Sequence, residues 1–251
     1  MPIATRDGRE LPYRVYGTGP AVALIPDATV GPWSWAWVLD ALGEELKTII
    51  YDPALPPADG DGISALAADL EAVLGAAAVR RTVLCGVGLG ALVALKHAHV
   101  HGRSHGLLLL GAGADWRPSE TLIKTLLDPD PIASLQPYLG DSLQSVDEEA
   151  LREWRETDDP GPRGRRRQLE VAQRCELPPL HEVTVTGAVR HGLRDNVWPV
   201  EGGRELAAAL PKAEFESVPD APHLLPVAAP IRVADDLVGV VERVTDREDL
   251  A

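Results

Sequence analysis

TVLCGVGLGALVAL, residues 82–95, is the stretch that decides the fold. It opens with TVLCGV, a run of apolar and small residues that is typical of a strand buried on both faces. Glycines stand at alternate positions, 86, 88 and 90, and an apolar segment without helix breakers follows them. The pattern predicts a buried strand, a sharp turn at Gly88 and a helix that begins at Leu89.

The rest of the chain continues this alternation of strand and helix. An Asp7-Gly8 hairpin opens it, and helical patterns separate the later apolar runs. Strands are expected at residues 21–26, 48–52, 82–87, 106–111, 182–186 and 214–218, and a closing helix at 231–244. The order predicts an α/β fold with a mostly parallel sheet and helices on both faces. Ligands of such a fold bind at the carboxyl ends of the strands.

One long region carries no strand signal. Residues 112–180 hold helical segments punctuated by prolines, a pattern that predicts a helical cap over the strand ends. At 251 residues the chain is expected to form a single domain, 1–251, with 112–180 inserted as the cap.

The net charge of −14 argues against nucleic acid and anionic membranes as partners, because both are repelled at long range. No apolar run approaches the roughly 20 residues that span a bilayer, and the first residues lack the features of a signal peptide. We therefore expect a cytoplasmic protein with a small-molecule substrate or ligand. A homo-oligomer stays possible.

The turn at Gly88 has the context of the G-x-S-x-G turn that lifts a nucleophilic serine above a parallel sheet, but glycine stands at the serine position. Asp195 follows the penultimate expected strand, and His223 follows the last one. With this order of turn, acid and histidine, the chain resembles the α/β-hydrolase superfamily over nearly its full length. The resemblance implies that Asp195 orients His223, that His223 is the general base, and that the amides of Ala28 and Leu89 form the oxyanion hole.

Two positions depart from that superfamily's pattern. Gly88 relieves the strained turn and removes the attacking atom. Asp27 stands where His-Gly is common, and its charge would oppose an oxyanion. Both departures argue against an acyl-enzyme. Residues 86–91 together with Asp27 also resemble, locally, the N-myc downstream-regulated protein family, whose turn lacks serine as well.

The remaining residues still allow acid/base chemistry. A histidine paired with a carboxylate removes protons without a serine, so the preferred hypothesis is an Asp195–His223 dyad acting on a carbonyl-containing, partly apolar substrate. Lyase, cyclase, isomerase and cofactor-free oxygenase reactions all fit. An ester or lactone hydrolase inactivated by Gly88 and a non-catalytic ligand-binding or scaffold protein are the alternatives. Asp27 is either a second acid or base facing His223 or a cap of the helix expected at 33–42.

Other candidates concern the substrate pocket and cofactors. Trp33, Trp35, Trp116 and Trp154 are candidates for lining an apolar pocket, with core packing as the alternative. His97 and His101 have ligand spacing but fall at the far end of the helix that follows Gly88, so no metal site is predicted. No cofactor is expected either, because no glycine loop stands in a phosphate-binding context.

Overall fold

The computed structural model describes residues 1–53 and 61–249, with the side chains of 154, 155 and 247–249 outside the description. Within this part the strands form one eight-stranded sheet in the order β1-β2-β4-β3-β5-β6-β7-β8. The strands are β1 (Ile3–Arg6), β2 (Arg9–Tyr16), β3 (Ala21–Ile25), β4 (Lys47–Tyr51), β5 (Thr82–Val87), β6 (Ser104–Leu110), β7 (Thr186–Gly192) and β8 (Ala213–Val218). From β4 to β8 neighbouring strands run parallel, while the β1–β2 hairpin adds two antiparallel strands at one edge.

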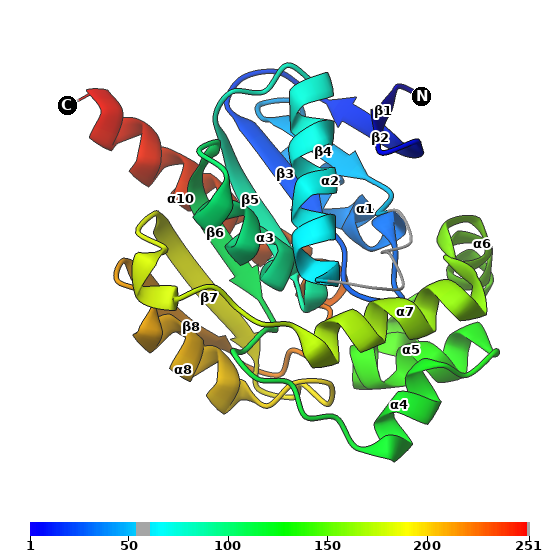
Figure 1. Ribbon diagram of the computed structural model, residues 1–251. Coiled ribbons are helices and arrows are strands. Elements are labelled where there is room, and N and C mark those ends of the chain that lie inside the picture. The colour runs from blue at the N-terminus through cyan, green and yellow to red at the C-terminus, as the bar shows by residue number, and fades with distance from the viewer. Residues whose placement is uncertain (54–60, 250–251) are drawn as a thin grey trace.

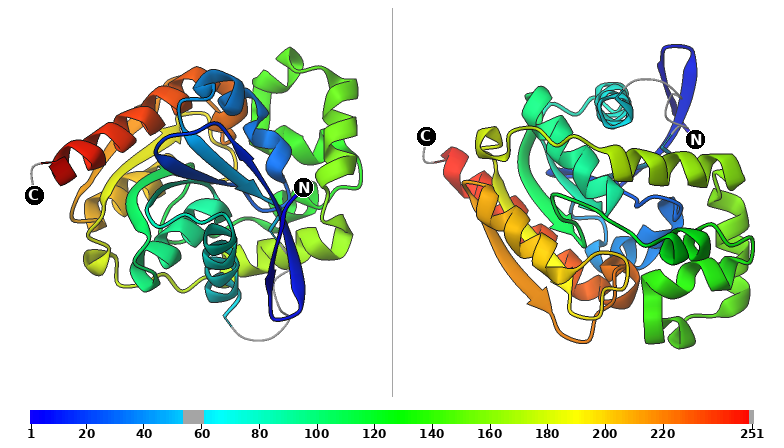
Figure 2. Two further views of the ribbon diagram at one scale, coloured as in Figure 1. Left: turned by 90° about the horizontal axis from the view of Figure 1, so that it is seen from above. Right: turned by 60° about the horizontal axis from the view of Figure 1, so that its bottom comes forward.

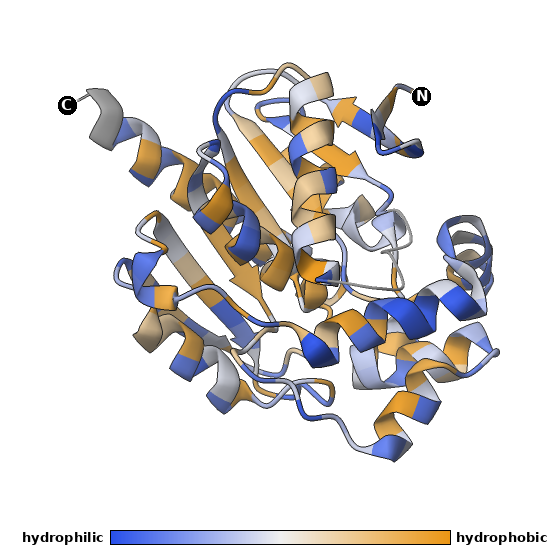
Figure 3. Ribbon diagram, in the orientation of Figure 1, coloured by the Kyte–Doolittle hydropathy of each residue, from blue (hydrophilic) through white to orange (hydrophobic). Residues whose placement is uncertain are grey.

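Helices cover both faces of the sheet (Figures 1 and 2). One face carries α1 (Ala36–Leu42) and α10 (Pro230–Asp249), and the other carries α2 (Gly62–Ala76), α3 (Leu89–Val100) and α8 (Val200–Ala209). The central strands are largely apolar, whereas hydrophilic and hydrophobic residues are mixed along most of the helices (Figure 3). This layering confirms the α/β architecture expected from the sequence, because strands buried on both faces need apolar residues on both.

A group of helices between β6 and β7 lies at the carboxyl ends of the parallel strands (Figure 1). We call this group the cap; it consists of α4 (Glu120–Leu126), α5 (Pro131–Leu139), α6 (Glu148–Asp158) and α7 (Gly161–Arg174), with the short η2 (Gly140–Ser145). The sequence pattern did not predict α5, which begins at Pro131 and is capped by the Asp130 side chain.

The strand expected at 182–186 was placed too early. The chain there forms the short η3 (Leu180–Glu182), and β7 runs from Thr186 to Gly192. Arg190 and His191 hide this strand from a hydropathy pattern, although both are buried. Arg190 is neutralised by Asp236 and Glu214, each 2.9 Å away. Because β7 ends at Gly192, the loop from β7 to Asp195 is short, and Asp195 lies close to the strand end.

Candidate active site

Gly88 forms the sharp turn between β5 and α3, with φ 51° and ψ −115°. This positive φ is the conformation that a side chain makes costly and glycine does not. The neighbouring glycines, Gly86 and Gly90, allow backbone segments to pack closely. A Cβ at Gly86 would collide with the backbone of Gly90, and a Cβ at Gly90 would collide with the carbonyl of Ile25. The alternate glycines therefore let helix α3 start directly against the strand ends.

Asp27 follows β3 and fills the space beside Gly88. Its Oδ1 accepts a 2.6 Å hydrogen bond from the amide of Leu89, at the start of α3. Its Oδ2 lies 3.0 Å from Nε2 of His223. A Cβ at residue 88 would overlap this carboxylate. Asp27 thus takes up one of the two predicted oxyanion donors, since helix N-termini attract anions.

The alternative role for Asp27, capping the next helix, is not what the structure has. The helical segment after β3 begins with η1 (Pro32–Trp35), and its N-cap residue is Gly31, without a side-chain cap. Ser34 donates its hydroxyl to the carbonyl of Gly31. The Asp27 carboxylate instead faces Leu89 and His223.

His223 lies between two carboxylates. Its Nδ1 is 2.7 Å from Oδ2 of Asp195, and its Nε2 faces Asp27. Ionised carboxylates only accept hydrogen bonds, so this arrangement favours the imidazolium, in which both ring nitrogens carry protons. Burial disfavours this charged form, but the charge of Asp195 and hydrogen bonds to both aspartates outweigh burial and raise the pKa of His223 to about 10.

Asp195 is almost fully buried and well supplied with donors. The amides of Val197 and Trp198 donate to Oδ1 at 2.7 and 2.8 Å, and Oδ2 is hydrogen-bonded to Nδ1 of His223. His191 adds its Nε2 at 3.0 Å from Oδ2. Burial would raise the pKa of Asp195, yet the His223 charge and these hydrogen bonds hold it well below its usual range. The sequence analysis missed His191, because an isolated histidine in an unrecognised strand gives no signal.

A small apolar cavity adjoins Asp27. Its volume is about 10 Å³, which is scarcely room for one water molecule. Its walls come from the strand ends and from the cap: Ala28, Leu89, Trp116, Tyr138, Leu169, Ala172, Val197 and Trp198. The described lining residues leave little free volume beside Asp27, and we expect the cap to move when a larger ligand binds.

The four candidate tryptophans have different positions. Trp116 lines the cavity, stacks on Trp198 at 5.7 Å and donates its indole N–H to the carbonyl of Val197. Trp33 and Trp35 are not among the residues that line this cavity; they are buried where η1 packs into the core, and Trp33 meets Trp37 edge to face. Trp154 is in α6, and its side chain lies outside the described part.

Two wall residues, Trp198 and Tyr138, were missed by the sequence analysis. Trp198 follows closely after Asp195, so its nearness to the site was a usable signal. Tyr138 belongs to the unpredicted helix α5 and lies against His223, with ring centroids 5.5 Å apart. No local sequence pattern predicts a contact between residues so far apart in the chain.

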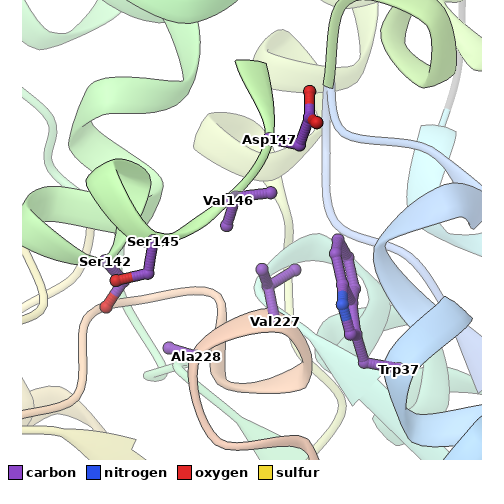
Figure 4. Close-up of a pocket in the computed structure, with 7 residues that line it drawn as sticks. All are labelled: Trp37, Ser142, Ser145, Val146, Asp147, Val227 and Ala228. Carbon is purple, nitrogen blue, oxygen red and sulfur yellow. The ribbon is translucent and has the colours of Figure 1, made fainter. Parts of the chain in front are cut away.

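A larger pocket of about 340 Å³ opens at the seam between the cap and the core (Figure 4). Its walls are Trp37, Ser142, Ser145, Val146, Asp147, Val227 and Ala228. None of these residues lines the cavity beside Asp27. The seam pocket is thus separate from the candidate active site.

Over residues 1–53 and 61–249, no group of three or more His, Cys, Asp or Glu side chains is arranged to hold a metal ion. His97 is engaged by Ser104 and Glu71. None of the helices in the described ranges is long and apolar enough to cross a membrane.

Comparisons with known proteins agree with this fold. No match was found among curated protein sequences. Solved structures with the same fold include an esterase from Thermogutta terrifontis (23% identity, 94% of each chain covered, TM-score 0.77) and an enol-lactonase from Burkholderia xenovorans LB400 (20%, 96% and 100%, 0.82). A meta-cleavage product hydrolase from Pseudomonas fluorescens IP01 is similar too (17%, 97% and 98%, 0.83). The model of the alpha/beta hydrolase family matches residues 22–236, and the chain belongs to that family.

Proposed function

We propose that the protein is a proton-transfer enzyme in which Asp27 is the base and no acyl-enzyme forms. One observation carries the proposal: the Asp27 carboxylate, held by Leu89 and His223, stands at the cavity where a serine side chain at residue 88 would otherwise project. The carboxylate borders an apolar cavity, so a substrate bound there would present its C–H bonds to Asp27.

His223 takes a different role from the one expected of it. With a pKa of about 10, it is already protonated at neutral pH and has no free lone pair for a substrate proton. It instead supplies positive charge next to Asp27. Asp195 fixes the ring through Nδ1 and compensates part of its charge.

The proposed step is removal of a proton from a C–H bond beside a carbonyl. The proton goes to Asp27, and the electron pair of the C–H bond moves into the carbonyl, giving an enolate whose negative charge the His223 imidazolium stabilises. Return of the proton to another carbon gives isomerisation, and loss of a leaving group or attack on an internal electrophile gives elimination or ring closure. No cofactor is needed for any of the three.

The cavity walls indicate the class of substrate. Trp116, Trp198 and Leu169 are apolar contacts, and the site already contains two carboxylates against one imidazolium. Another negative charge would be repelled and desolvated there. We therefore propose an uncharged, partly apolar carbonyl compound.

Solvent-deuterium exchange tests the proposal without knowledge of the natural substrate. The protein is incubated in D₂O with a panel of neutral aryl ketones and 1,3-dicarbonyl compounds, and exchange at the α-carbon is followed by NMR. We expect exchange above background that Asp27→Asn reduces at least 100-fold, in line with the usual contribution of a general base of about 10²–10⁴. An unchanged rate of α-carbon exchange in Asp27→Asn would contradict the proposal.

A non-catalytic ligand-binding protein is the second candidate. The Asp27 carboxylate favours it, because it already occupies the Leu89 amide and Nε2 of His223, two groups that would otherwise face a reacting substrate. Under this alternative, ketones that raise the melting temperature show no α-exchange, and Asp27→Asn leaves their binding unchanged. The same panel of compounds therefore separates the two functions.

The hydrolase alternative, loss of serine from an otherwise ordinary site, fits less well. Serine at residue 88 would collide with Asp27 in its present position. A disabled hydrolase would need Asp27 to have a different position as well, so a change at residue 88 alone does not account for the site.

A further inference from the structure

The loop that carries Asp27, residues 27–33, is held by the cap. We call it the Asp27 loop. Three cap side chains, from three different helices, form hydrogen bonds with it: Tyr138 of α5, Asp158 of α6 and Gln168 of α7. The Asp27 carboxylate itself is bound by the core, through Leu89 and His223. The loop therefore bridges two parts of the molecule.

Tyr138 binds the loop just after Asp27. Its hydroxyl donates to the carbonyl of Ala28 at 2.8 Å and lies 3.0 Å from Oγ1 of Thr29. The carbonyl only accepts, so the tyrosine proton is directed to Ala28 and the threonine hydroxyl donates to the tyrosine oxygen. All three residues are buried, where such bonds are costly to lose.

Gln168 fixes the most strained residue of the loop. Thr29 has φ 67°, a conformation that is unfavourable for a β-branched residue. Its amide donates to Oε1 of Gln168 at 2.8 Å. A strained backbone persists only where its surroundings hold it, and here part of those surroundings is a cap helix.

Asp158 completes the attachment at the end of the loop. Its Oδ2 accepts from the amide of Trp33 at 2.7 Å. Gly31 allows this close approach, because a Cβ there would lie 2.9 Å from Cβ of Asp158. The cap and the loop are thus complementary along its whole length.

From these contacts we infer that Tyr138, Gln168 and Asp158 are positioning residues that hold Asp27 between Leu89 and His223 only while the cap is closed. The inference rests on the proposed function for the catalytic role of Asp27. The described residues leave little free volume beside Asp27, so substrate entry displaces the cap in this scheme. Displacing the cap releases the Asp27 loop, and closure over the substrate restores the base. The same cap movement then controls both substrate entry and the positioning of Asp27.

Proton NMR of His223 tests the inference without any assay of activity. In the native protein we expect two strongly hydrogen-bonded ring N–H signals, one facing each aspartate. In Tyr138→Phe with Gln168→Met, the Nε2–H signal should broaden or vanish through exchange with water, while the Nδ1–H signal persists. The pKa of His223 should fall by at least one unit. Thr125→Val is the matched control, because it removes a cap hydrogen bond to Thr121 and none to the loop.

Unchanged signals and an unchanged His223 pKa in the double variant would overturn the inference. Amide hydrogen exchange of the native protein provides a second test that needs no variant. We expect the amides of Thr29 and Trp33 to exchange together with those of α5 and α7, and faster than those of β3 and α3. Loop amides that stay as protected as β3 while the cap exchanges would also overturn it. Neither result depends on whether α-exchange of ketones is found.

Discussion

The carboxylate of Asp27 occupies the volume that a side chain at residue 88 would need, so the two positions depend on each other. Glycine at 88 leaves room for the carboxylate, and the carboxylate binds the Leu89 amide and the His223 ring. The turn at Gly88 thus makes space for a carboxylate.

Gly88→Ser is expected to destabilise the protein. The side chain collides with Asp27, and overpacking of this kind costs roughly 1–3 kcal/mol of unfolding free energy. Urea denaturation measures the loss. Gly43→Ser is the control, because Gly43 also has a positive φ, 60°, but nothing within 4 Å of its Cβ position. Equal losses in the two variants would mean that backbone strain, not the collision, is responsible.

Gly88→Ser combined with Asp27→Gly is expected to create a reactive serine. With Asp27 removed, the new hydroxyl faces Nε2 of His223 and the Leu89 amide becomes available to an oxyanion. A fluorophosphonate probe should label the double variant at least tenfold faster than Gly88→Ser alone. Adding His223→Ala should abolish the labelling. Equal labelling of the single and double variants would show that Asp27 does not block the site.

His223 gives the stability a specific dependence on pH. Its folded pKa of about 10 lies above the ordinary value of 6.5, so the protonated ring stabilises the folded state. This stabilisation is complete below pH 6.5 and is lost as pH rises through 10, with a slope of up to about 1.4 kcal/mol per pH unit. Urea denaturation between pH 6 and 10 measures it. His223→Gln should lack this part of the slope, and identical pH profiles would contradict the assignment.

Asp27→Gly is expected to bind acetate. The vacated space retains the Leu89 amide and the His223 N–H, which together form a receptor for a small carboxylate. Millimolar acetate should raise the melting temperature of the variant but not that of the native protein. Acetamide, which has the same shape and no charge, is the control. A similar effect of both compounds would mean that the space does not select a carboxylate.

Gly90→Ala tests the close packing of α3 on the sheet. Its Cβ would collide with the carbonyl of Ile25, and we expect a loss of roughly 1–3 kcal/mol in unfolding free energy. Gly239→Ala, in the interior of α10 with open space around it, should instead stabilise the protein by about 0.5–1 kcal/mol. Thermal or urea unfolding of both variants distinguishes these outcomes. Stabilisation by both would show that α3 is not tightly packed at Gly90.

The sequence by itself determined the layered α/β fold and the turn at Gly88. It also indicated that Asp195 and His223 come together. The fold and the turn follow from local properties, because apolar runs mark buried strands and glycine spacing marks the turn. The pairing of Asp195 with His223 is what the resemblance to the α/β-hydrolase superfamily implied for two residues that follow strand ends. Parallel strands then bring those ends to the same edge of the sheet.

Only the tertiary structure decided what surrounds these residues. Asp27 and His223 are 196 positions apart, and whether the carboxylate caps a helix or faces the imidazole depends on packing between distant segments. Strand β7 was misplaced for a similar reason, because the charge of Arg190 is neutralised by Asp236, which belongs to α10. The hydrogen bonds of Tyr138 and Gln168 to the Asp27 loop likewise form only when the cap is folded over the sheet. Local periodicity predicts whether a residue is buried. Its hydrogen-bonding or ion-pair partner, however, often comes from a distant part of the chain and is known only from the tertiary structure.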